Sequence, residues 1–106
     1  MSISTHVLDA VTGRPAAGLE VTLRTRADDG WHELTRRGTD SDGRVADLAR
    51  EAGAGVYQLT FGTEAYLGAE AFYPEVVVVF RVTDADAHHH VPLLLSPFAY
   101  STYRGS

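Results

Sequence analysis

The sequence predicts an all-β fold, a two-sheet antiparallel sandwich of about eight strands with one short helix. Glycine and proline recur at short spacing, and the segments between them are rich in Val, Leu, Thr, Tyr and Phe. Several segments alternate apolar and polar residues, which is the period of a strand with one buried face. The chain has 106 residues, the length of one domain. We therefore expect residues 1–106 to form a single domain.

The first half of the chain contains three expected strands. Residues 3–10 are mostly apolar and end near Asp9, before the turn-forming segment TGRPAAG. Residues 19–26 alternate in period 2, and the turn at 28–30 connects them to residues 31–37 as a hairpin. A polar turn then precedes Arg44, and its glycine is suited to positive φ.

The second half contains the expected helix and four further strands. Residues 56–61 and 75–83 are expected strands, and residues 63–70 form the helix, with Thr63 as its N-cap. The segment VVVVF within 75–83 is apolar on both faces, so we expect it to be buried between layers or at a subunit contact. Residues 88–95 and 98–104 form two strands joined by a proline-containing corner.

Composition excludes several classes of protein and site. The chain has no cysteine, so it has no disulfide, thiolate nucleophile or iron–sulfur cluster. Nine basic residues stand against 14 acidic ones, a net charge of -5 that argues against a nucleic-acid partner. The longest apolar run, at 76–80, is far too short to span a membrane, and the first residues lack a secretory signal. We expect a cytoplasmic protein.

Five histidines are the most informative titratable groups, because imidazole exchanges protons near neutral pH. Alternation on a strand places His88 and His90 on one face and His89 on the other. One interpretation is a proton-handling or metal-binding pair, and the plainer one is a solvated strand start. A stable zinc site needs three or four ligands in set geometry, and no third ligand is evident. We predict no metal.

Three other features have both a functional and a structural interpretation. His6 lies within an apolar strand, where a lone histidine is commonly a hydrogen-bonded structural residue. Arg44 follows a glycine turn and is either a plain surface residue or a binding site for an oxygen-rich anion. The terminal residues 103–106 are either frayed or in contact with a ligand. No nucleophile-elbow, phosphate-loop or dinucleotide motif is present.

Five segments, in this order along the chain, favour the functional interpretation of these residues. They are STHVLD at 4–9, TGRPA at 12–16, DGR at 42–44, HVPLLLSP at 90–97 and YRGS at 103–106. Together they resemble the 5-hydroxyisourate hydrolases, the transthyretin-related enzymes of urate breakdown, over essentially the whole chain. The resemblance implies an eight-stranded sandwich with one short helix. It also implies a homotetramer, a dimer of dimers, with active sites at the interface.

The resemblance assigns functional residues position by position. It implies that His6, Arg44 and His90 are catalytic, and that no cofactor or metal is required. The implied substrate-binding residues are His6, Arg44, Tyr103, Arg104, Gly105 and Ser106. Phe98 and Ala99 stand where the family often has tyrosine and glycine, and His89 stands where an aromatic residue is common. These departures concern the fine shape of the pocket.

The implied reaction is hydrolysis of 5-hydroxyisourate, a small purine-derived substrate, to 2-oxo-4-hydroxy-4-carboxy-5-ureidoimidazoline by a water that two histidines and an arginine activate. One alternative is a non-catalytic, transthyretin-like carrier of small aromatic ligands. A second is a structural sandwich in which the histidines are incidental. The two histidines and the terminal YRGS favour the enzyme, because a carrier needs no paired proton-transfer groups.

Overall fold

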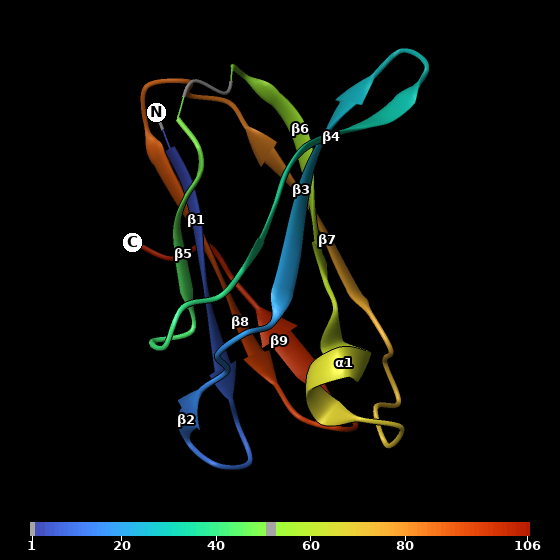
Figure 1. Cartoon of the computed structure of the whole chain (residues 1–106). Coiled ribbons are helices and arrows are strands. Elements are labelled where there is room, and N and C mark those ends of the chain that lie inside the picture. The colour runs from blue at the N-terminus through green and yellow to red at the C-terminus, as the bar shows by residue number, and fades with distance from the viewer. Residues whose placement is uncertain (1, 51–52) are drawn as a thin grey trace.

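Two β-sheets pack face to face (Figure 1). The buried apolar side chains form one core cluster. The computed structural model describes residues 2–50 and 53–106. One sheet, named here the β1 sheet, contains β1 (Ser2–Asp9), β2 (Arg14–Pro15), β5 (Arg44–Ala49), β8 (His88–Leu95) and β9 (Tyr100–Thr102). The other, the β3 sheet, contains β3 (Glu20–Ala27), β4 (Gly30–Gly38), β6 (Gly55–Phe61) and β7 (Val76–Val82). The predicted all-β sandwich is confirmed.

The core forms because β1, β3, β5, β6, β7 and β8 turn apolar positions toward the opposite sheet, whereas β2, β4 and β9 contain no buried residue. Residues that are at most 1% exposed come from both sheets: Ile3, Val7, Leu19, Val21, Leu23, Leu59, Phe61, Val76, Val82, Leu93 and Leu95. Burying a side chain of this kind contributes about 1.5–3 kcal/mol. The positions between them face outward, and in β1 and β8 those outward positions carry serine and histidine.

The pairing of β1 with β8 corrects the expected all-antiparallel order. These two strands run parallel over eight residue pairs, from Ser2 with His88 to Asp9 with Leu95. Every other strand pair in the described residues is antiparallel. Parallel pairing requires a long connection, and here it joins the first strand to the last third of the chain (Figure 1).

The short helix differs from its prediction. α1 spans Thr63–Leu67 only, and the N-cap is Gly62 rather than Thr63. The Thr63 hydroxyl is buried and donates to the Tyr73 carbonyl at 2.6 Å, so it ties the helix to the following loop instead of capping it. Among the described residues, no helix is long and apolar enough to cross a membrane.

Four strands also depart from expectation. β2 lies in a segment that was expected to be only a turn. β5 was not predicted from the sequence, because its alternation is short and begins inside the polar turn. β7 is paired only with β6 among the described strands, and Val77 and Val79 are 42% and 54% exposed, so it is not buried between layers. Its exposed face leaves the alternative of a subunit contact open. β9 is shorter than residues 98–104.

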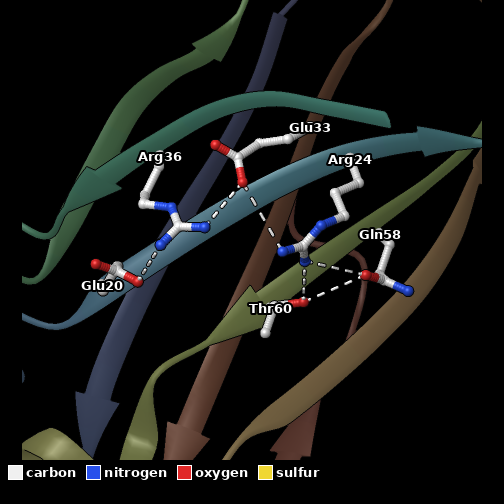
Figure 2. A network of polar contacts seen from close by, with 6 residues as sticks. All are labelled: Glu20, Arg24, Glu33, Arg36, Gln58 and Thr60. Atoms are coloured by element: carbon white, nitrogen blue, oxygen red, sulfur yellow. Dashed lines mark hydrogen bonds and ion pairs between the residues drawn. The ribbon is translucent and has the colours of Figure 1, made fainter. Parts of the chain in front are cut away.

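A polar network covers the outer face of the β3 sheet (Figure 2). It consists of six side chains: Glu20, Arg24, Glu33, Arg36, Gln58 and Thr60. Arg24 donates to Thr60 at 2.9 Å, which links β3 to β6, and Arg36 donates to Glu33 at 2.9 Å within β4. The ion pairs are largely exposed, so each contributes only about 0–1 kcal/mol.

Candidate active site

The structure brings the three predicted catalytic residues to one face of the β1 sheet. Arg44 on β5 is the direct partner of His6 on β1. His90 on β8 pairs with Ser4, which lies two residues before His6 on the same strand. Because side chains on a strand alternate, Ser4, His6 and His90 share the face that points away from the core. Residues distant in the sequence therefore meet through the central position of β1.

The turn before β5 fixes both Arg44 and His6. The Asp40 carboxylate accepts the backbone N–H groups of Asp42 and Arg44, each at 2.9 Å. His6 Nε2 lies 2.9 Å from the Asp42 carbonyl oxygen. A carbonyl can only accept, so Nε2 of His6 carries a proton. The turn thus sets the tautomer of His6 and leaves its Nδ1 as the free nitrogen of the neutral ring.

A cavity of about 310 Å³ opens on this face. Its lining residues are Ser4, Thr5, Arg44, Ala46, His88, His90 and Ser106. Arg44, His90 and Ser106 therefore lie around one space, which places one cation, one half-buried imidazole and Ser106 together. His6 is beside this cavity through its pairing with Arg44 but does not line it.

His90 is the electrostatic centre of the cavity. Burial lowers the pKa of His90 below its ordinary value of 6.5, and electrostatic interactions with Arg44, His88 and His6 lower it further. Its Nδ1 lies 2.7 Å from the Ser4 hydroxyl. A neutral ring with one nitrogen held by Ser4 leaves the other nitrogen for proton exchange, which is the requirement for a general base or acid.

The C-terminal tetrapeptide is ordered against His90 rather than frayed. The Gly105 N–H donates to the His90 carbonyl at 2.8 Å, and the two residues form an isolated β-bridge. Ser106 lines the cavity described above. Tyr103 and Arg104 instead line a second cavity of about 220 Å³, which also touches His90. The predicted binding residues in the terminal segment thus line two different cavities that share His90.

The remaining two histidines of the β8 triplet have different surroundings. His89 points into the core, is 4% exposed, and its Nδ1 donates to the Ala87 carbonyl at 3.1 Å. His88 is exposed and lines the cavity with His90. Sequence alternation predicted this division. Among residues 2–50 and 53–106, no group of three or more metal-ligating side chains is placed to hold a metal ion.

Ser4 was not identified as a site residue from the sequence. Its hydroxyl lies within hydrogen-bond distance of rings on both His88 and His90. The parallel register of β1 and β8 creates this contact, and strand periodicity alone does not predict which strands become neighbours. The alternation that places Ser4 on the same face as His6 was the available signal.

Comparisons with known proteins agree with this architecture. Residues 3–105 match the model of the HIUase/Transthyretin family. The 5-hydroxyisourate hydrolase of Mus musculus is 47% identical over 111 residues, covering 98% of this chain and 94% of the mouse protein. The solved 5-hydroxyisourate hydrolase of Klebsiella pneumoniae superposes with a TM-score of 0.87 at 35% identity, covering 100% of both chains. Transthyretin from Sparus aurata gives 0.91 at 33% identity, covering 98% and 96%. The fold alone therefore does not distinguish the two kinds of relative.

Proposed function

The chain belongs to the HIUase/Transthyretin family, and from this membership we propose that it is a hydrolase that converts 5-hydroxyisourate to 2-oxo-4-hydroxy-4-carboxy-5-ureidoimidazoline in urate breakdown. The observation that carries the proposal is the juxtaposition of His90 and Arg44 in one cavity, with the pKa of His90 lowered. A neutral imidazole beside a fixed cation suits the addition of water to an anionic, oxygen-rich ring.

In the proposed reaction, His90 takes a proton from a water molecule as that water attacks the ring carbonyl. The same proton then passes to the leaving nitrogen as the ring opens. A positioned acid or base of this kind contributes about 10²- to 10⁴-fold to the rate. His6, whose Nε2 is held by the Asp42 carbonyl, orients the water or the substrate from the neighbouring strand.

Arg44 supplies the positive charge. Its guanidinium lines the cavity, and we propose that it binds the carbonyl and enolate oxygens of the substrate and stabilises the oxyanion that develops in the transition state. Tyr103 and Arg104 line the second cavity together with His90, and we propose that they contact the substrate from that cavity. Gly105 and Ser106 hold the end of the chain against His90.

A non-catalytic carrier of small aromatic ligands is the second candidate. The similarity to transthyretin supports it. Against it stands the composition of the cavity, in which His88, His90 and Arg44 replace the mainly apolar lining that a carrier of aromatic ligands requires. The catalytic assay below separates the two.

We further propose that the protein is a homotetramer, a dimer of dimers, with the active sites at an interface. Large apolar side chains remain exposed on the single chain, including Val11 at 68%, Phe98 at 74% and Val79 at 54%. Exposed apolar groups of this size favour association. Light scattering coupled to gel filtration tests the subunit number, and a monomer would contradict this part of the proposal.

The decay of freshly generated 5-hydroxyisourate, measured with and without protein, tests the activity. We expect the wild-type protein to accelerate the decay, and His90→Asn to fold normally and lose at least about 100-fold in kcat. His32→Asn is the matched control, because His32 is exposed on β4 and pairs with Asp29, away from the cavity. A fully active His90→Asn protein would refute the assigned role of His90. A wild-type protein without effect would refute the hydrolase.

A further inference from the structure

A continuous line of polar side chains extends from His90 to the exposed end of β1. Ser4 Oγ lies 2.7 Å from His90 Nδ1 and 3.0 Å from His88 Nε2. The opposite nitrogen of His88, Nδ1, is hydrogen-bonded to the hydroxyl of Ser2. The two imidazole rings lie nearly parallel, with an interplanar angle of 17° and centroids 6.3 Å apart. Four side chains thus form one chain of contacts.

The strand register produces this line. In the parallel pair of β1 and β8, Ser2 is opposite His88 and Ser4 is opposite His90, so all four side chains project from the same face. Ser4 is only 7% exposed. Its buried hydroxyl therefore depends on the two histidines, because an unpartnered buried hydroxyl is unfavourable. The contacts are a fixed property of this face.

Proton counting allows two directions for the hydrogen bonds. A serine hydroxyl has one proton to donate, and a neutral imidazole has one N–H and one bare nitrogen. In the first direction, His90 Nδ1–H donates to Ser4, and Ser4 donates to His88 Nε2. In the second direction, His88 Nε2–H donates to Ser4, and Ser4 donates to His90 Nδ1.

The two directions correspond to the two chemical roles of His90. The first leaves Nε2 of His90 bare and able to accept a proton from water. The second places a proton on Nε2, ready for the leaving nitrogen. We propose that Ser4 and His88 are positioning residues that set the tautomer of His90 and relay its proton during hydrolysis. This inference rests on the proposed function.

The relay balances at each step. When His90 Nε2 takes a proton from water, the Nδ1 proton moves to Ser4, whose own hydroxyl proton moves to His88 Nε2. His90 and Ser4 are then neutral, and His88 carries the positive charge. As His90 Nε2 gives its proton to the leaving nitrogen, the protons move back from His88 to Ser4 and from Ser4 to His90 Nδ1. The starting state is restored.

The relay moves positive charge away from Arg44 and toward solvent, which favours the transfer. Arg44 is opposite His6 on β1, His90 is opposite Ser4, and His88 is opposite Ser2. The transfer therefore moves positive charge two residues farther along the strand from the arginine, about 6–7 Å at the ordinary strand rise. It also moves the charge from a half-buried ring to an exposed one, where water solvates it better.

Two variants and one spectroscopic measurement test the inference. His88→Gln keeps a hydrogen-bonding side chain at an exposed position but cannot hold the relayed proton. We expect its kcat to fall about 10-fold or more, with KM within about threefold of wild type, as for loss of an interaction made only in the transition state. Ser4→Ala is expected to behave in the same way. His32→Gln serves as the control, since the His32 side chain lies on β4, does not line the cavity and is hydrogen-bonded to Asp29.

Nitrogen NMR of the imidazole rings provides the readout that does not depend on turnover. We expect His90 of the free wild-type protein to carry its proton on Nδ1 above about pH 8, well above the ordinary pKa of an imidazole, and Ser4→Ala to lose this preference. A wild-type His90 protonated on Nε2 under these conditions, or an unchanged kcat in a folded His88→Gln protein, would overturn the relay. If wild type shows the tautomer but no hydrolysis, the proposed function fails and the relay in hydrolysis fails with it, while the tautomer-setting contact stands.

Discussion

Gly105 lies directly against the ring of His90. Its N–H donates to the His90 carbonyl at 2.8 Å, and a Cβ added to Gly105 would meet His90 Cδ2 at 2.6 Å and His90 Cγ at 3.2 Å. Both are ring atoms near the β8 backbone rather than the tip of a flexible side chain, so a Cβ there would fit only if the ring rotated or the terminal segment shifted. Only a glycine leaves room for the imidazole in its observed place.

Gly105→Ala is therefore expected to displace the His90 ring and to reduce kcat about 100-fold, the scale of loss associated with a misplacement of about 1 Å. We expect little change in the free energy of unfolding, because Gly105 lies at the end of the chain outside the core. Gly38→Ala is the matched control, since a Cβ there has nothing within 4 Å. Measurements of kcat and of urea unfolding decide it, and full activity in Gly105→Ala would contradict the prediction.

The sequence predicted the sandwich because alternation and turn residues are local signals. The hairpin at 28–30 illustrates this: β3 ends at Ala27 and β4 begins at Gly30, each within one residue of the expected strand ends at 26 and 31. Three of the site residues came together as predicted from the resemblance: Arg44, His90 and Ser106. The resemblance supplied these positions, whereas alternation alone showed only that His88 and His90 share a face.

The sequence did not predict contacts that depend on which strands become neighbours. Ser4 acquires its partners from the parallel pairing with β8, a non-local choice with no signature in either strand. The prediction of Thr63 as the N-cap of the helix was wrong for a related reason. The Thr63 hydroxyl has a tertiary acceptor, the Tyr73 carbonyl, which the sequence does not show and which replaces the expected local cap.

The decline of kcat/KM at low pH should follow the protonation of His90. Burial first, then the charges of Arg44, His88 and His6, lower its pKa below 6.5. His90 stays neutral until the pH falls to its own lowered pKa, so we expect kcat/KM to decline with a midpoint below 6.5. The folded protein should also lose stability as pH falls below about 6.5, because the unfolded chain binds this proton more readily. Rate measurements and an NMR titration of His90 test both statements, and a flat rate from about pH 5 to 8 would oppose histidine as the base.

Asp9 and Tyr66 link the end of β1 to α1. The Tyr66 hydroxyl donates to Asp9 Oδ2 at 2.9 Å, and Asp9 Oδ1 accepts the N–H of Val11 at 2.9 Å and that of Thr12 at 3.1 Å. Burial raises the pKa of Asp9, but these donors outweigh it and hold the pKa below 3.8. The carboxylate therefore stabilises the fold above the unfolded pKa, and this contribution disappears as pH falls through the folded pKa.

Tyr66→Phe should consequently cost about 1.5–3 kcal/mol near neutral pH, the range for a hydrogen bond to a charged group. The difference from wild type should shrink once Asp9 becomes protonated, below about pH 4. Tyr100→Phe is the control, because it removes a hydroxyl from an exposed tyrosine. Urea unfolding at several pH values measures both variants. A cost independent of pH down to full protonation of Asp9 would show that the carboxylate is not the partner that matters.

Gly43 has a positive φ and also lies close to β1, whereas Gly13 has only the positive φ. Both have positive φ, 75° and 73°, which L side chains adopt only at a cost of roughly 1–2 kcal/mol. A Cβ on Gly13 has nothing within 4 Å, whereas one on Gly43 would meet the Val7 carbonyl oxygen at 2.4 Å. The Val7 N–H also donates to the Gly43 carbonyl at 2.8 Å, so the turn cannot retreat from β1 without breaking this bond.

We expect Gly13→Ala to lower the free energy of unfolding only by the conformational cost of positive φ. Gly43→Ala should lower it by at least about 2 kcal/mol more, as for other severe steric changes in a packed backbone. Gly43 also lies between Arg44 and Asp42, whose carbonyl oxygen accepts from His6. Gly43→Ala should therefore lower kcat/KM even at temperatures where the protein remains folded. Gly13→Ala should keep wild-type kcat/KM. Urea unfolding and the hydrolysis assay on both variants measure these effects. Equal destabilisation of the two would mean that φ, rather than the approach of β1, is what requires glycine at position 43.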